Sequence, residues 1–180
     1  EALPLSKEDY TYETVFDASA DVLNSNRIWL RFDGVDTLAD VTLNGVLLGN
    51  TYNMHREWEF PVKDILKEKD NKLEIYFHSP MVYMEEQLKL QGAIPCNTDT
   101  LDGFPYLRKS NCMSGWDWAP KLPDMGLFRD VYLIGMNEDR ILDVLVRQKH
   151  ENGTVELHFD VNTCKKAHGA SSEYKVTVTA

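Results

Sequence analysis

The sequence has few cysteines and no long run of apolar residues. Its three cysteines, Cys96, Cys112 and Cys164, are widely spaced, and no two of them form a CxxC pair. This odd, scattered set argues against a disulfide framework or a zinc site. A bridge between Cys96 and Cys112 across a loop is one alternative, and a reduced intracellular protein is the simpler interpretation. No apolar run approaches the roughly 20 residues that span a bilayer, so we expect no membrane partner.

Positive charge is also scarce. The chain of 180 residues has 29 acidic and 19 basic side chains, for a net charge of −10. This balance argues against a nucleic-acid partner or an anionic membrane surface. The five histidines show no ligand spacing, so we expect neither a metal nor a cofactor. The N-terminus carries no basic-then-apolar secretion signal. That absence carries little weight, because the chain can be a fragment. The unpaired cysteines and the Lys/Glu-rich turns favour a bacterial cytoplasm over a lysosomal or secreted location.

What the chain does have is alternation of apolar and polar residues, the pattern of antiparallel β-sheets. Within it, Asn44-Gly45 predicts a two-residue hairpin turn that needs positive φ angles. The fold class expected is therefore all-β. The predicted strands span residues 10–16, 27–32, 57–62, 72–78, 127–134, 141–149, 154–161 and 174–179, and residues 40–49 form two further strands joined by the turn.

Three segments break the alternation. Residues 62–69 predict one or two helical turns, and residues 81–91, between Pro80 and Gly92, predict a longer helix. Residues 92–121 show little periodicity and are rich in Pro, Gly, Asn and Asp. A loop of this length inside a compact domain is usually functional when it is ordered. Four aromatic residues weigh against disorder in this loop: Phe104, Tyr106, Trp116 and Trp118.

The most informative run lies in this loop, where Trp116-Asp117-Trp118 follows the cations Arg108 and Lys109. Sugars are bound by aromatic faces and a few convergent hydrogen-bonding groups, and two indoles around a carboxylate supply both. The structural alternative is a buried aromatic plug in which Asp117 caps backbone amides. The residues alone favour this alternative slightly.

Several blocks in a fixed order resemble the N-terminal sugar-binding domain of glycoside hydrolase family 2, within its β-mannosidase branch. The resemblance covers residues 10–136, and residues 138–180 resemble the immunoglobulin-like domain that follows. It implies a jelly-roll, galactose-binding-like sandwich over residues 1–137, lacking upstream strands, and the truncated start of an immunoglobulin-like sandwich over residues 138–180. The blocks are Tyr12–Phe16, Phe32-Asp33-Gly34-Val35-Asp36, Val41–Gly49, Phe60-Pro61-Val62, and Arg108-Lys109 through Trp116-Asp117-Trp118 to Phe128-Arg129-Asp130-Val131.

The resemblance implies a non-catalytic portion of a retaining exo-β-mannosidase. Its partners would be a β-mannoside or manno-oligosaccharide and a downstream barrel domain of the same polypeptide, which holds the catalytic glutamates. In this interpretation Asp117 accepts hydrogen bonds from sugar hydroxyls, and Trp116 lines the same subsite. Trp118 packs to hold the loop, and Arg108 and Lys109 support Asp117 electrostatically.

No residue of this chain is assigned to catalysis. Glu85 and Glu86 lie on the predicted helix, where neighbours point about 100° apart and cannot face one bond. Glu57 and Glu59 alternate with apolar residues as a solvated strand side. Two other functions stay open: a free-standing carbohydrate-binding module, or a structural brace domain of a family 2 β-galactosidase or β-glucuronidase.

Overall fold

A computed structural model describes residues 3–96 and 99–164 of the chain. The chain divides into two compact units, the first ending at Gly135 and the second beginning at Met136. Each unit is described by itself.

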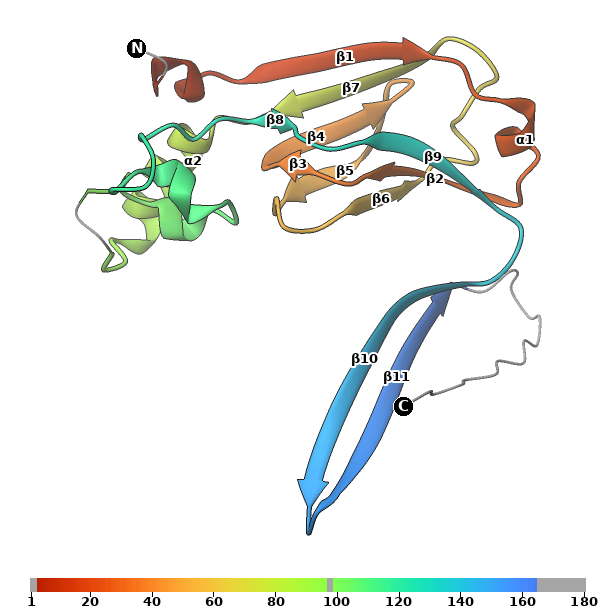
Figure 1. Cartoon of the computed structure of the whole chain (residues 1–180). Coiled ribbons are helices and arrows are strands. Elements are labelled where there is room, and N and C mark those ends of the chain that lie inside the picture. The colour runs from red at the N-terminus through yellow and green to blue at the C-terminus, as the bar shows by residue number, and fades with distance from the viewer. Residues whose placement is uncertain (1–2, 97–98, 165–180) are drawn as a thin grey trace. The chain divides into compact units, whose positions relative to one another are not determined.

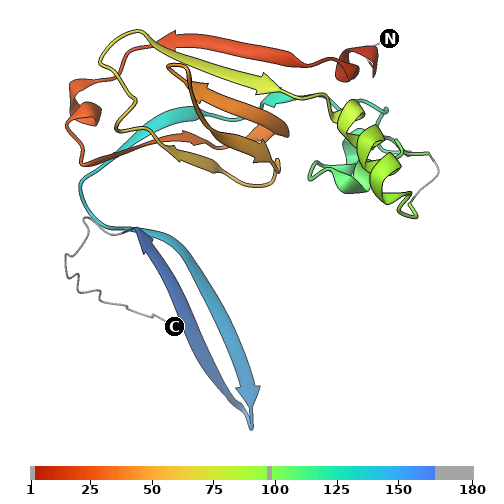
Figure 2. The ribbon, with the colours of Figure 1, turned by 180° about the vertical axis from the view of Figure 1, so that it is seen from behind.

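The first unit is a sandwich of two β-sheets (Figures 1 and 2). Neighbouring strands in the four-stranded sheet pair antiparallel, which confirms the predicted all-β class. The strand order in the four-stranded sheet is β1 (Tyr10–Phe16), β7 (Asn71–Phe77), β4 (Leu38–Leu43) and β5 (Val46–Tyr52). The second sheet has the order β6 (Trp58–Pro61), β2 (Arg27–Phe32) and β9 (Val131–Met136). A short pair is formed by β3 (Val35–Asp36) and β8 (Gly126–Leu127).

The core lies between the two sheets. Buried residues alternate with partly exposed ones along β2 and β4, as the sequence period predicts. Phe32 and Phe60 meet edge to face, with their ring centroids 6.0 Å apart. Each large apolar side chain buried there stabilises the fold by about 1.5–3 kcal/mol. The buried cluster comprises Ile28, Leu30, Phe32, Val35, Ala39, Val41, Leu43, Trp58, Phe60, Val62, Leu73, Ile75 and Phe77.

The predicted hairpin turn is confirmed, since Asn44 and Gly45 have φ angles of 52° and 81°. Of the one or two helical turns expected in residues 62–69, one hydrogen-bonded turn is present, from the Leu66 amide to the Val62 carbonyl. The buried Asn71 explains why it goes no further. Its side-chain oxygen accepts the N–H of Lys67, and its side-chain nitrogen donates to the carbonyl of the same residue. These groups are therefore not available to extend a helix.

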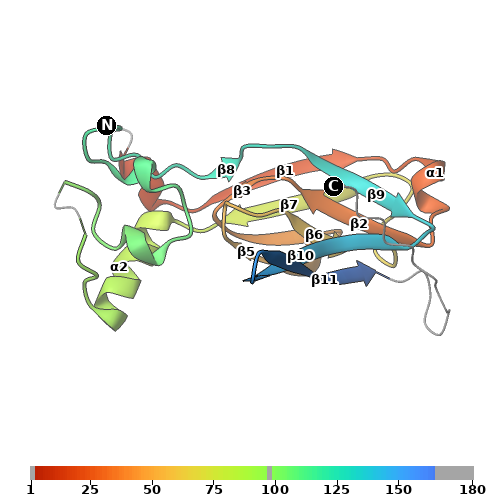
Figure 3. The same cartoon turned by 60° about the horizontal axis from the view of Figure 1, so that its bottom comes forward.

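The longer predicted helix is present as α2 (Pro80–Gln91), with the Ser79 hydroxyl accepting from the Val82 amide and Gly92 ending it at a φ of 84°. A short helix that the sequence did not predict, α1 (Ala20–Leu23), and three 3-10 helices, η1 (Leu3–Lys7), η2 (Phe104–Tyr106) and η3 (Asn111–Ser114), complete the described part. The helix α2 and the loop after it lie at one end of the sandwich, and α1 lies at the other (Figures 1 and 3). Within the described ranges, no helix combines the length and apolarity needed to cross a bilayer.

The second unit, as far as residue 164, is one hairpin of β10 (Arg140–Glu151) and β11 (Thr154–Cys164). Asn152 and Gly153 turn the chain with φ angles of 51° and 78°. The strands expected at 141–149 and 154–161 are confirmed and are longer than predicted, whereas the strand expected at 174–179 lies outside the described residues. Apolar side chains along both strands, such as Leu145 and Phe159, are exposed. A two-stranded hairpin alone is marginally stable, so these side chains need a covering surface.

Candidate functional site

The loop between α2 and β8 folds around a small core of its own. Met84 of α2 packs there with Leu101 and Leu107, next to the partly buried Phe104. The backbone of residues 99–101 is also bonded to that of residues 114–116, through Leu101 N to Ser114 O at 2.8 Å and Trp116 N to Asp99 O at 3.1 Å. These contacts fix the loop as an ordered structure at the end of the sandwich.

Two consecutive residues with positive φ angles turn the chain outward at the indoles. Gly115 has a φ of 110°, and a Cβ there would lie 2.6 Å from Lys121 Cγ and 3.0 Å from the Asp99 carbonyl oxygen. Trp116 follows with a φ of 75°. A bulky side chain in this region is uncommon and costs on the order of 1–3 kcal/mol, which the surrounding structure must offset. Such local costs are concentrated at binding and active sites.

The two indoles and the carboxylate between them are exposed. Trp116 and Trp118 contact each other edge to face, with ring centroids 4.1 Å apart and planes at 83°. Their side chains are 44% and 56% exposed. Asp117 is exposed as well, and in residues 3–96 and 99–164 no hydrogen bond or ion pair engages its carboxylate. These exposures exclude the buried-plug alternative and leave the carboxylate available to a ligand.

Lys109 does not lie where the sequence interpretation expected it. Its ammonium is bound to the Asp36 carboxylate, and it also donates to the Asp124 carbonyl at 2.9 Å and to the Asp124 carboxylate at 3.1 Å. Its side chain is only 4% exposed. A buried ammonium needs a buried carboxylate as partner, and Asp36 meets that need where the exposed Asp117 does not. The contacts of Lys109 are therefore with the sandwich and with the end of the loop.

Asp36 is a member of the site that sequence reasoning missed. Burial raises the pKa of its carboxyl group, although the Lys109 ammonium and the Thr37 hydroxyl, which donates to it, both favour the charged form. In the sequence the only local sign is an aspartate directly after the apolar Val35, and the structure supplies the rest. Val35 and Asp36 are consecutive and both buried, and a carboxylate in such a position requires a cation from elsewhere in the fold.

Arg108 points away from this buried pair, because it is exposed between the buried Leu107 and Lys109. Its carbonyl accepts the Met54 amide at 3.0 Å, which joins the loop to the segment before β6. Its side chain lines a cleft of about 530 Å³ together with His55 and Asn111. In the part of the chain that the structure describes, Arg108 forms no ion pair with Asp117.

The paired carboxylates Glu57 and Glu59 share one cation. Arg31 approaches Glu59 at 2.9 Å and Glu57 at 3.6 Å, and its Nε lies 2.7 Å from Asp33. The hydrogen bond to Asp33, followed by that to Glu59, raises the pKa of Arg31. This ion cluster fits the expectation that Glu57 and Glu59 are surface charges rather than a catalytic pair.

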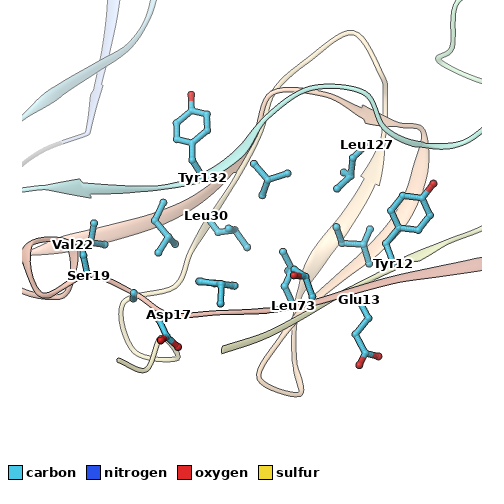
Figure 4. A pocket seen from close by; sticks show the side chains of 15 residues that line it. Tyr12, Glu13, Asp17, Ser19, Val22, Leu30, Leu73, Leu127 and Tyr132 are labelled. Carbon is cyan, nitrogen blue, oxygen red and sulfur yellow. Dashed lines mark hydrogen bonds between the residues drawn. The ribbon is translucent and has the colours of Figure 1, made fainter. Parts of the chain in front are cut away.

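A second concave surface lies beside β1 and β9, and we call it the β1–β9 groove (Figure 4). It has a volume of about 570 Å³ and includes Leu30, Leu73 and Leu127. Apolar side chains gather along it, whereas the Glu13 carboxylate and the Tyr132 hydroxyl point away from it (Figure 4). Sugars need convergent polar groups. The groove therefore does not have the lining that a sugar site needs.

The three cysteines are free thiols, with Cys96 and Cys112 exposed. Among the described residues, no group of three or more His, Cys, Asp or Glu side chains is arranged to hold a metal ion.

An antiparallel sandwich with an exposed aromatic–carboxylate loop at one end places this chain in the class of β-sandwich domains. The family model described as glycosyl hydrolase 2 galactose-binding domain-like matches residues 2–129, and the chain belongs to this family. This confirms the resemblance to glycoside hydrolase family 2.

Named relatives agree with the β-mannosidase branch. The chain is 33% identical to a β-mannosidase of Capra hircus, over 92% of this chain and 20% of that protein. It is 31% identical to β-mannosidase B of Aspergillus clavatus, again over 92% and 20%. The chain thus spans about one fifth of the length of these curated relatives, and it corresponds to a portion of a family 2 glycoside hydrolase.

Solved structures give the same result. A β-D-mannosidase from Dictyoglomus thermophilum superposes with a TM-score of 0.74 at 34% identity, covering 88% of this chain and 19% of that one. A β-glucuronidase from Bifidobacterium dentium superposes with a TM-score of 0.58 at 20% identity, over 89% of this chain and 28% of that one. At that identity the second likeness shows the fold alone.

Proposed function

We propose that this chain positions the terminal β-mannosyl residue in a retaining exo-β-mannosidase, for a catalytic barrel domain that lies downstream in the same polypeptide. The observation that carries the proposal is the exposed pair of indoles around the exposed carboxylate of Asp117. The relatives named β-mannosidase, at 31–34% identity, support the choice of sugar.

In this proposal Trp116 lies against the C–H surface of the sugar ring, and Asp117 accepts hydrogen bonds from its hydroxyl groups. Trp118 holds the Trp116 ring through the edge-to-face contact. The chain contributes orientation and water exclusion to the assembled site, and no bond-breaking group.

We further propose that the hairpin of β10 and β11 begins an immunoglobulin-like sandwich, in which further strands cover its exposed apolar side chains. The exposed free thiols of Cys96 and Cys112 support a reducing compartment such as a bacterial cytoplasm.

The test is Asp117→Ala in the longer enzyme that contains this chain. A hydrogen bond to a charged group contributes about 1.5–3 kcal/mol, so kcat/KM for an aryl β-mannoside should fall about 10- to 150-fold. Asp102→Ala is the matched control, because Asp102 is an exposed aspartate of the same loop. Equal turnover in the two variants would refute the proposal and favour a structural brace domain.

The exposure of both indoles also favours a second candidate, a free-standing carbohydrate-binding module. Isothermal titration of this chain with manno-oligosaccharides separates the two. Binding heat that disappears in Trp116→Ala supports the module. The absence of heat supports a half-site that needs the barrel.

A further inference from the structure

We infer that Lys109 is a positioning residue: its ammonium closes the base of the loop that carries the indoles and thereby sets where Trp116 and Asp117 stand. We call residues 109–124 the indole loop. The inference rests on the proposed function only for its effect on sugar turnover, and its structural part is tested separately.

The geometry of the indole loop supports this role first. Lys109 is the first residue of the loop and Asp124 the last, yet the Lys109 ammonium bonds both the carbonyl and the carboxylate of Asp124. The two ends of a 16-residue segment therefore meet at one nitrogen atom. Trp116 and Asp117 are at the midpoint of the segment. Compact loops whose ends meet in this way often carry function at their tip.

The same ammonium also fastens the loop to the sandwich. It bonds the carboxylate of Asp36 in β3, and Asp36 pairs with Gly126 in β8, two residues after the loop ends. The Asp36 side chain is 7% exposed and that of Lys109 is 4% exposed, whereas that of Asp124 is 66% exposed. The fastening point is therefore buried, and the loop extends from it to the surface.

Inside the indole loop the Leu122 amide donates to the Met113 carbonyl at 3.0 Å, which joins the two sides of the loop. Trp116 is bonded through its amide to Asp99. Closure at the base and the backbone bonds of Ser114 and Trp116 to residues 99–101 define the direction of the indoles. Loss of the ammonium releases the base and lets the loop shift about these remaining bonds.

Removing one charge alone also destabilises the fold, because an unpaired buried carboxylate remains. The decisive variant is therefore the double change Lys109→Met with Asp36→Asn, which removes both charges and nearly keeps the side-chain volumes. Replacing a buried ion pair by well-packed apolar residues of similar volume is often neutral for stability, and the change Asp36→Asn keeps an acceptor oxygen for the Thr37 hydroxyl. The double variant should therefore recover the stability lost in Lys109→Met without recovering the loop closure.

The readout is fluorine NMR of the full 180-residue chain labelled with 5-fluorotryptophan. The chain has four tryptophans, two in the strands β2 and β6 and two in the indole loop, and Trp116→Phe and Trp118→Phe assign the loop pair. In the double variant we expect the Trp116 and Trp118 resonances to shift and broaden while the two strand resonances stay in place. The exposed lysine variant Lys89→Met is the control, and all four resonances should be unchanged in it.

Unchanged Trp116 and Trp118 resonances in the double variant would overturn the inference, as would an equal shift of all four. In the longer enzyme the double variant should lose about 10- to 100-fold in kcat/KM, the range expected when a contact group is misplaced by about 1 Å. Shifted resonances with full turnover would preserve the loop closure and refute the proposed function instead.

Discussion

Replacing Gly115 by alanine is the most direct way to disturb the indoles without touching them. Gly115 precedes Trp116 and adopts a φ of 110°, a conformation that side chains rarely adopt. A Cβ at this position would also lie 3.0 Å from the Asp99 carbonyl oxygen and 2.6 Å from Lys121 Cγ. The lysine chain can move, but the carbonyl is bonded to the Trp116 amide. The backbone around the indoles must therefore shift.

The expected loss of stability in Gly115→Ala follows from comparison with a glycine whose surroundings are open. Gly92 has a φ of 84°, and a Cβ there would meet nothing within 4 Å. Gly92→Ala should therefore cost only the left-handed backbone penalty of about 1–2 kcal/mol. Gly115→Ala pays a similar penalty and adds a crowding cost of about 1–3 kcal/mol. The difference between the two variants in the free energy of unfolding therefore measures the crowding around a Cβ at position 115, next to Trp116.

The assay pairs thermal unfolding by circular dichroism with acrylamide quenching of tryptophan fluorescence. Each kcal/mol should lower Tm by about 2–4 °C in a chain of this size, and Gly115→Ala should show the larger loss. If the loop opens by itself, the cost appears as increased quenching of the loop indoles at an unchanged Tm. Equal Tm values together with equal quenching in the two variants would refute the reasoning.

Two further predictions concern the sandwich. Asn71→Ala should lower the free energy of unfolding by about 1–3 kcal/mol for each buried group that it leaves unpaired. Urea denaturation measures this loss. Asn50 is exposed, so the control variant Asn50→Ala should change the free energy of unfolding little. Hydrogen bonds from the Tyr76 hydroxyl and, second, from the Ser79 amide lower the pKa of Asp9 from its ordinary value of 3.8. The charged Asp9 therefore stabilises the fold above pH 3.8, and this stabilisation is lost as the pH falls through the lowered pKa. Asp9→Asn should therefore melt below the wild type at neutral pH, and the gap should narrow in acid; a constant gap in Tm would contradict this.

The fold was predictable because burial in a sandwich imposes a period of two on the sequence. The alternation in β2, β4 and β7 and the Asn44-Gly45 turn are local signals, and they placed these elements within a few residues. The helical turn in residues 62–69 was predicted, and it goes no further because a side chain outside the window, Asn71, takes the hydrogen bonds that a longer helix would need.

The candidate site was predictable in its composition and not in its geometry. The Trp116-Asp117-Trp118 run marks an aromatic–carboxylate loop in any fold, but its exposure depends on the φ angles at Gly115 and Trp116. The partner of Lys109 was not predictable by proximity, because Asp36 lies 73 residues away in sequence. The sequence analysis predicted Asp117 as the partner of Lys109 because Asp117 is nearer in sequence than Asp36. Spacing along the chain carries no information about which carboxylate is buried.

The position of the ionic fastening has a consequence for the order in which the protein is made. Asp36, Lys109 and Asp124 all precede residue 126, where β8 begins. Domains fold as units while the ribosome continues to extend the polypeptide. The indoles can therefore take up their final direction through contacts that all lie within the first sandwich and its loop, without any contact from residues beyond Gly135.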